Sequence, residues 1–151
     1  MSEDSILLAI EQGVATITLN RPQSLNSFNA DMHEALRKAL DTVKADDRVR
    51  VLVLTGSGRG FCAGLAARPR APGDDAPDLG PSIETWYNPL IRTLKDLPVP
   101  VICAVNGVAA GAGANIALSC DIVLAARSAS FVQDFCKLGL VPDSGGTWIL
   151  P

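Results

Sequence analysis

The stretch VICAVNGVAAGAGANIAL, residues 101–118, decides the fold of this chain and points to its chemistry. Five apolar residues predict a buried strand, Asn106-Gly107 predicts a turn, and small residues then lead into an apolar segment with helical spacing. From residue 108 to 114 no side chain is larger than valine, so another group must approach this backbone closely. The first N–H groups of the predicted helix, near Gly111, have no acceptor within the helix. We therefore interpret this segment as a site for an anion or a polarised carbonyl oxygen.

Strands and helices alternate on both sides of this segment. The Asn29 cap and apolar residues at helical spacing predict a helix over residues 30–43, and residues 83–97 predict another that Pro89 must kink or interrupt. Residues 68–81 are rich in Pro, Gly and Asp and predict a long exposed loop. The alternation favours an α/β fold with a largely parallel sheet. The predicted strands are residues 6–10, 14–19, 49–55, 101–105 and 122–126, of which the first two form a hairpin.

Composition limits the classes of function. A chain of 151 residues with 48% hydrophobic and 19% charged residues is sufficient for one globular domain with its own core. The formal charge of −3 and the scattered basic residues argue against a nucleic-acid partner. No apolar run approaches the ~20 residues that a membrane-spanning helix needs. Residues 1–20 lack the basic and apolar regions of a signal peptide, so we expect a cytoplasmic protein without a membrane partner.

The cysteines and the single histidine do not indicate a metal or redox site. Cys62, Cys103, Cys120 and Cys136 are widely separated and form no C-x-x-C pair, so we expect buried, reduced thiols. His33 lies in the first predicted helix between Met32 and Glu34, which favours a position at the surface or its boundary over a catalytic role. The sequence therefore predicts no metal and no redox cofactor.

A second segment of small residues, residues 60–64, also follows a strand. In a parallel sheet two such strand ends can converge on one ligand, and two backbone N–H groups directed at one oxygen make an oxyanion hole. Two ordinary glycine turns explain the pattern equally well. Residues 111–117 also match G-x-G-x-x-A, but five residues separate the first glycine from the strand, so nucleotide binding is disfavoured.

Asp143 lies in an apolar turn ahead of two glycines and a predicted helix start near residue 147. As a structural residue it would cap that helix or form the turn, as Asp commonly does. As a functional residue, a carboxylate in apolar surroundings would be a general base with a raised pKa. The composition of the segment alone favours the structural role.

Together these three elements resemble the crotonase (enoyl-CoA hydratase/isomerase) superfamily. The matching segments are residues 14–22, 60–64, 106–113 and 142–147, in the family's order and over nearly the whole chain. The resemblance implies an α/β fold of repeated ββα units, with residues 1–151 as the N-terminal core and the family's C-terminal helices absent. It also implies an acyl-CoA substrate, with coenzyme A as part of that substrate, and a homotrimer or dimer of trimers at full length.

The resemblance assigns roles to individual residues. Two backbone N–H groups, of Leu65 and Ala112, would hold the thioester oxygen as it becomes an enolate. The hydratases use two glutamates, and this chain has Asn115 and Phe135 at those positions, so addition of water is disfavoured. Asp143 matches the carboxylate of members that move protons without adding water. The predicted substrate-binding residues are Ala63, Gly64, Leu65, Gly111, Ala112 and Asn115.

Within the family, residues 78–80, 86–90 and 139–148 most resemble the isomerases of phenylacetate degradation. Those enzymes convert ring 1,2-epoxyphenylacetyl-CoA to the oxepin-CoA. Relatives usually carry two further residues, one of them aspartate, between Gly64 and Leu65. Two other functions stay open: a Δ3,Δ2-enoyl-CoA isomerase or hydratase-like member of fatty-acid oxidation, and a non-catalytic acyl-CoA-binding subunit.

Overall fold

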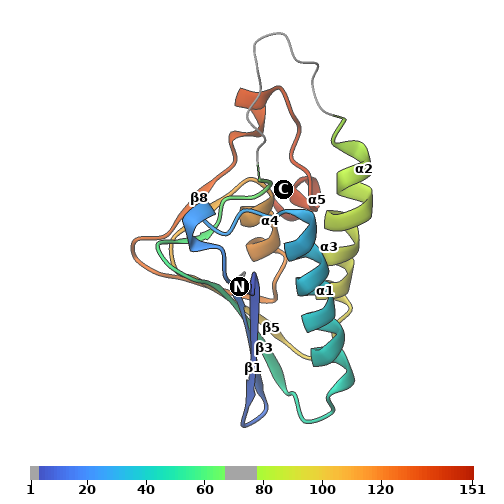
Figure 1. The fold of residues 1–151 in the computed structure, drawn as a ribbon. Coiled ribbons are helices and arrows are strands. Elements are labelled where there is room, and N and C mark those ends of the chain that lie inside the picture. Colours follow the sequence, from blue (N-terminus) through green and yellow to red (C-terminus); the bar gives the residue numbers. More distant parts are fainter. Residues whose placement is uncertain (1–3, 67–77) are drawn as a thin grey trace.

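The computed structural model describes residues 4–66 and 78–151, so residues 68–77 of the predicted exposed loop lie outside this part. The described residues form two sheets and a group of helices (Figure 1). The large sheet has the strand order β1-β2-β3-β5-β7, and the small sheet has the order β4-β6-β8. The strands are β1 (Ile6–Glu11), β2 (Val14–Leu19), β3 (Val51–Gly56), β4 (Gly60–Cys62), β5 (Val101–Val105), β6 (Val108–Ala110), β7 (Ile122–Ala125) and β8 (Ser130–Val132). The helices are α1 (Ala30–Ala45), α2 (Gly80–Ser82), α3 (Asn88–Lys95), α4 (Ala112–Leu118) and α5 (Gly146–Ile149), with short turns η1 (Pro22–Ser24), η2 (Ile83–Tyr87) and η3 (Asp134–Leu138).

The large sheet confirms the predicted alternation. β1 and β2 form an antiparallel hairpin, and β2, β3, β5 and β7 pair in parallel. The hairpin turns at Gln12 and Gly13, both with positive φ, as a two-residue hairpin turn requires. Alternate residues of β2 are buried, so one side of this strand faces the core. β3 begins at Val51, two residues later than predicted.

Two helices lie side by side along one face of the large sheet, α1 and α3 (Figure 1). The backbone N–H of Met32 donates to the side-chain oxygen of Asn29 at 3.0 Å, which confirms the predicted cap of α1. The predicted interruption before α3 takes the form of η2, a single π-helical turn. The helix runs on from η2 without a break, and Pro89, which has no N–H to donate, directly follows the π-helical turn.

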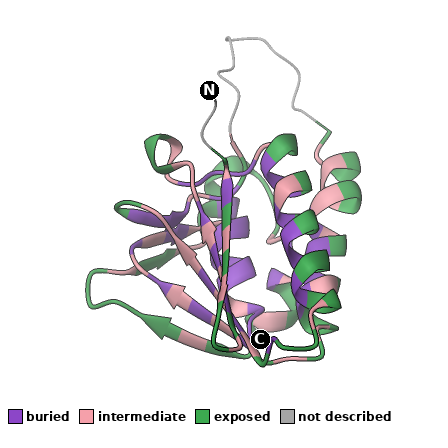
Figure 2. Cartoon of the chain, turned by 60° about the horizontal axis from the view of Figure 1, so that its bottom comes forward, coloured by how far each residue is buried: buried purple, intermediate pink, exposed green. Residues whose placement is uncertain are grey.

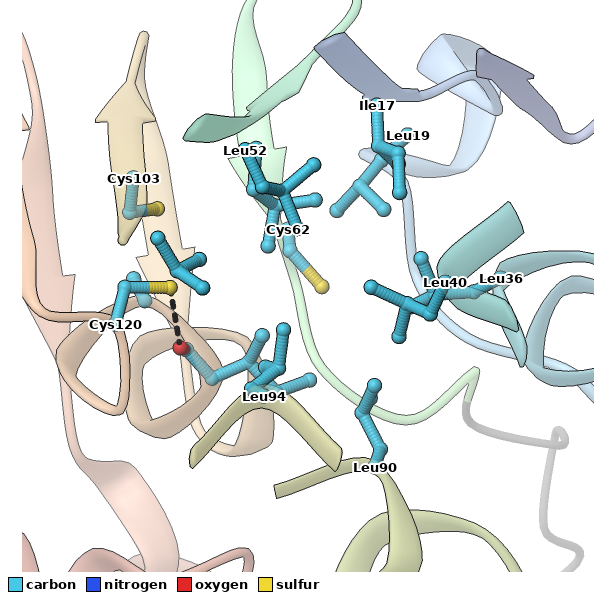
Figure 3. Packing of buried hydrophobic residues seen from close by; sticks show 14 of the residues in the cluster. Ile17, Leu19, Leu36, Leu40, Leu52, Cys62, Leu90, Leu94, Cys103 and Cys120 are labelled. Atoms are coloured by element: carbon cyan, nitrogen blue, oxygen red, sulfur yellow. Dashed lines mark hydrogen bonds between the residues drawn. The ribbon is translucent and has the colours of Figure 1, made fainter. Parts of the chain in front are cut away.

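The core lies between these helices and the sheets. Figure 2 shows buried residues on the inner sides of the elements and exposed residues on their outer sides. In Figure 3, leucines of α1 and α3 meet Ile17, Leu19 and Leu52 of the large sheet. The fully buried aliphatic side chains there account for most of the favourable free energy of folding, at about 1.5–3 kcal/mol each.

Three cysteines confirm the prediction of buried thiols, and one contradicts it. Cys62, Cys103 and Cys120 are buried and unpaired, and the Cys120 thiol donates to the carbonyl oxygen of Ile116 at 3.5 Å (Figure 3). Burial raises the pKa of Cys62 to about 12, so this thiol stays protonated. Cys136 is exposed, because it lies in the short turn η3, most of whose side chains are exposed.

The small sheet was not predicted. Its strands have three residues each, which is too short for an alternating pattern to be read from the sequence. β4 pairs in parallel with β6, and β6 with β8. The buried amide of Asn26 joins this sheet to the large one by donating to the carbonyl oxygens of Ser57, Gly60 and Phe61, at 2.9, 2.9 and 3.1 Å.

In residues 4–66 and 78–151, every helix is too short or too polar to cross a bilayer. The same residues bring together no group of three His, Cys, Asp or Glu side chains that would hold a metal ion.

Candidate active site

Leu65 is held against Phe28 by a single bridge between parallel segments. The N–H of Phe28 donates to the carbonyl oxygen of Gly64 at 2.7 Å, and the N–H of Ala66 donates to the carbonyl oxygen of Phe28 at 2.9 Å. In a trans peptide the N–H of one residue points opposite to the preceding C=O. Since the Gly64 carbonyl points toward Phe28, the Leu65 N–H points away from it. No described residue accepts a hydrogen bond from that N–H.

The start of α4 holds a second free N–H. The carbonyl of Gly111 accepts from the N–H of Asn115 at 3.1 Å and therefore points into the helix. The N–H of Ala112, in the same peptide as that carbonyl, points out of the helix start. Within the described part of the chain this N–H also has no acceptor. Gly111 adopts a φ of 52°, which sets the sharp entry into α4.

Gly64 lies where the segment that carries Leu65 meets the start of α4. Its φ is +83°, and a Cβ at this position would lie 2.9 Å from the carbonyl oxygen of Ala110 and 3.4 Å from the nitrogen of Ala112. The segment after β4 therefore touches the start of α4. Ala63, whose N–H donates to the carbonyl oxygen of Leu25 at 2.9 Å, fixes the same segment from the other side. The two segments of small residues therefore lie in contact, at the small sheet and not at the large one, and the convergence of their N–H groups on one ligand stays a prediction.

Asp143 lies half-buried in the turn before α5. Its carbonyl oxygen accepts from the N–H of Gly146 at 2.8 Å, and its carboxylate accepts from the hydroxyl of Ser144 at 2.8 Å. Burial raises the pKa of Asp143, and the Ser144 hydroxyl partly offsets this. In the described chain no side chain caps α5, so the capping role considered for Asp143 is excluded. Its backbone forms the turn while its carboxylate remains available.

Asn115 connects Asp143 to the start of α4. Its side-chain amide nitrogen donates to the carbonyl oxygen of Asp143 at 2.7 Å, and its amide oxygen accepts from Gln133 at 2.6 Å. The side chain is fully buried. A Cβ on Gly146 would lie 2.5 Å from the Asn115 amide, so the turn after Asp143 rests directly on it. Asn115, predicted to bind substrate, is therefore seen here as the residue that positions the Asp143 turn.

The second position of a hydratase glutamate carries a buried aromatic ring. Phe135 is 7% exposed, and its ring lies beside the start of α4, 3.7 Å from where a Cβ of Gly111 would stand. An apolar ring at this position transfers no proton. The structure therefore places Asn115 and Phe135 around the site, with Asp143 as the carboxylate beside them.

His33 is buried, so the prediction of a position at the surface or its boundary is wrong. It is 6% exposed and packs against Phe28, Trp86 and Tyr87, with ring centroids 4.5, 5.5 and 4.5 Å away. Burial lowers the pKa of His33 to about 4, so the ring is neutral at pH 7. The helical pattern marked the adjacent Met32 as apolar but could not show that the η2 segment covers the next residue.

Two residues near the site gave no signal in the sequence. Gln133, which holds Asn115, lies in an irregular segment, and Phe28, which holds Leu65, acts through its backbone. Backbone contacts carry no side-chain signature. The proximity of Asn115 to Gln133 depends on the path of the chain after β8, which has no periodic pattern.

Comparisons with known proteins agree with this arrangement. Residues 9–151 match the family model described as enoyl-CoA hydratase/isomerase. The chain is 63% identical over 148 residues to the 1,2-epoxyphenylacetyl-CoA isomerase of Escherichia coli (strain K12), covering 97% of this chain and 56% of that protein. It is 47% identical to a probable enoyl-CoA hydratase of Rhodobacter capsulatus, over 100% of this chain and 57% of that protein. A crystal structure of an enoyl-CoA hydratase from Mycobacterium smegmatis superposes with a TM-score of 0.85 at 32% identity. The match covers 96% of this chain and 56% of that one.

The chain spans just over half the length of these relatives. The match with the family model nevertheless covers almost all of its residues, and the structural agreement extends over both sheets. The chain therefore belongs to the enoyl-CoA hydratase/isomerase family.

Proposed function

We propose that this protein is an acyl-CoA thioester isomerase and that its substrate is 1,2-epoxyphenylacetyl-CoA. The observation that carries the proposal is the hydrogen bond from Asn115 to Asp143, which ties a half-buried carboxylate to the helix that begins at Ala112. The name of the Escherichia coli relative supports the choice of substrate. The residues at the two positions of the hydratase glutamates support isomerisation over addition of water.

In the proposed mechanism the substrate's thioester oxygen lies between the N–H groups of Leu65 and Ala112. The Asp143 carboxylate removes a proton from the carbon next to the thioester carbonyl, and the negative charge moves onto that oxygen as an enolate. The two N–H groups stabilise the enolate, and loss of one such donor typically costs about 2.7–4 kcal/mol of transition-state stabilisation. In the epoxide, the ring bond between the two oxygen-bearing carbons breaks to give the seven-membered oxepin ring. The protonated Asp143 returns its proton to a carbon of that ring, two bonds from the α-carbon, so atoms and charge balance.

The surroundings of Asp143 support its role as the base. Burial raises its pKa, so it accepts a proton more readily than an exposed aspartate does. The contacts of its carbonyl oxygen with Gly146 and Asn115 fix the backbone without occupying the carboxylate. The Ser144 hydroxyl occupies one carboxylate oxygen and leaves the other for the substrate.

The test measures turnover of two substrates by the natural full-length protein. An epoxyphenylacetyl-CoA and a 3-enoyl-CoA are assayed side by side, and we expect the higher kcat/KM with the epoxide. A higher kcat/KM with the 3-enoyl-CoA would favour the fatty-acid isomerase. Tight CoA binding without proton exchange at the α-carbon would indicate a non-catalytic subunit instead.

We further propose that residues 1–151 are the ligand-binding core of a homotrimer or dimer of trimers. Large apolar side chains of the segment around Asp143 support this, since Leu138, Val141 and Trp148 are 74%, 77% and 73% exposed. Such side chains are typical of surfaces that other segments or subunits cover. Sedimentation of the full-length protein tests the proposal, and a monomer at micromolar concentration would contradict it.

A further inference from the structure

The phenol hydroxyl of Tyr87 is buried and has no hydrogen-bond partner among the described residues. The residue is 2% exposed, and no described residue lies within hydrogen-bonding distance of its hydroxyl. A buried hydroxyl is normally paired, because leaving it without a partner costs free energy. An unpaired donor at this depth is therefore a place where a bound molecule would supply the missing acceptor.

Tyr87 ends η2 and leads directly into α3, one face of which meets the segment after Asp143. Ile91, four residues further on, lies on the same helix face, and its Cγ2 is 3.4 Å from where a Cβ of Gly145 would stand. Lys95, another four residues on, places its ammonium 5.7 Å from the ring centre of Trp148. Ile91 and Lys95 thus contact the segment that follows Asp143, and Tyr87 lies one turn before Ile91.

The other side of the Tyr87 ring faces the segment that holds Leu65. Its ring packs edge-on against Phe28, with centroids 6.1 Å apart, and Phe28 is the residue whose backbone brackets Leu65. Burial raises the pKa of Tyr87, and the nearby Cys62 and Asp143 raise it further. The phenol is therefore neutral and acts as a donor. It lies between the proposed base and the segment that carries one proposed oxyanion donor.

We infer that Tyr87 is a specificity-determining residue, whose hydroxyl donates a hydrogen bond to an oxygen atom carried by the acyl group of the substrate. This inference rests on the proposed function, in which the acyl ring carries an epoxide oxygen. A purely hydrocarbon acyl chain would leave the buried hydroxyl unpaired and is therefore disfavoured. Tyr87 thus orients the ring toward Asp143 and separates oxygenated from simple enoyl substrates.

The experiment compares Tyr87→Phe with the wild type in the natural full-length protein on both substrates. We expect the ratio of kcat/KM for the epoxyphenylacetyl-CoA to kcat/KM for the 3-enoyl-CoA to fall about tenfold, the loss of one neutral hydrogen bond. We also expect an unchanged or higher melting temperature, because the hydroxyl has no partner in the free protein. A melting temperature lowered by several degrees would show a structural partner and overturn the inference.

Thr93→Val is the matched control, since it removes a hydroxyl from the same helix. Thr93 lines a groove with His33 and Arg37 on the side toward α1, away from the Asp143 turn. We expect this variant to keep the wild-type ratio. An equal fall on both substrates in Tyr87→Phe, or an unchanged ratio, would overturn the inference. Turnover of the epoxide by the wild type tests the proposed function separately. If the wild type did not turn over the epoxide, the proposed function and the inference about Tyr87 would both fail.

Discussion

The side chain of Asn115 donates a hydrogen bond to the carbonyl oxygen of Asp143 at 2.7 Å, across 28 positions of the sequence. This contact joins the two halves of the proposed site, because Asn115 belongs to the helix that starts at Ala112. The same side chain accepts from Gln133, so one buried amide holds two separate segments. The amide nitrogen and the amide oxygen of Asn115 are thus both hydrogen-bonded to other parts of the protein.

Replacing Asn115 by Ala is expected to lower kcat about 10- to 100-fold, because the Asp143 turn loses one of its two backbone contacts and the carboxylate moves. The free energy of unfolding should fall by about 1–3 kcal/mol, since Gln133 is left without its partner. Asn29→Ala is the control: it removes a helix cap at a cost of about 1 kcal/mol and should keep wild-type kcat. Equal kcat in the two variants would contradict the positioning role.

Replacing Asp143 by Asn should lower kcat about 10²- to 10⁴-fold, because the base is removed while the shape is kept. The variant should also be slightly more stable at neutral pH. A raised pKa in the folded state means that the charged carboxylate opposes folding, and this penalty disappears as the pH falls through the raised pKa. Chemical denaturation of both proteins at pH 7 measures this.

The pH dependence of the wild type provides a second check on Asp143. Activity should fall toward acid pH as the carboxylate takes up a proton, with a midpoint above that of an ordinary aspartate. The exposed Asp96→Asn variant should show the same profile as the wild type. A wild-type profile that is flat across this range would exclude Asp143 as the base.

Replacing Gly64 by Ala should abolish measurable isomerisation. The added methyl group would lie 2.9 Å from the carbonyl oxygen of Ala110 and 3.4 Å from the nitrogen of Ala112, so it would push the two donor segments apart. Gly139→Ala separates this effect from backbone strain, since Gly139 also has positive φ but its Cβ would meet nothing within 4 Å. Both variants should lose about 1–2 kcal/mol of stability from strain. Wild-type turnover in Gly64→Ala would refute the proposed position of the site.

The buried His33 predicts a loss of stability in mild acid. Its pKa is about 4 in the folded protein and 6.5 in the unfolded chain, so the unfolded state binds more protons between these values. The free energy of unfolding should therefore fall by about 3 kcal/mol at most as the pH drops from 7 to 4. His33→Phe should flatten this part of the curve, and an unchanged slope would show that other groups cause it.

The sequence predicts the large sheet, α1 and the start of α4 well, because their apolar residues recur with strand or helix periods. The small sheet escapes prediction, since three-residue strands such as β4 are too short to show a period. The proposed donors were reached only through family resemblance, as a backbone N–H leaves no mark on residue type. The burial of His33 was mispredicted because the η2 segment that covers it is distant in sequence.

Tyr87 shows a further limit of the sequence. A single tyrosine in a helical segment is an ordinary core residue, and nothing in the pattern distinguishes a paired hydroxyl from an unpaired one. That distinction depends on which atoms the fold brings near the phenol. It emerges only when the fold shows that Phe28 packs on the Tyr87 ring while α3, which follows Tyr87, contacts the segment after Asp143.

Because Phe28 brackets Leu65 through main-chain atoms alone, the position of Leu65 is insulated from the identity of its own side chain. The side chain of Leu65 is 43% exposed, so its substitution should cost little stability. The constraint falls on neighbours of small volume, above all Gly64 and Gly113, where a Cβ would come within 2.9 Å of other atoms. Surveys of natural variation should find tolerance at Leu65, which offers an N–H group, and intolerance at the glycines that leave room for it.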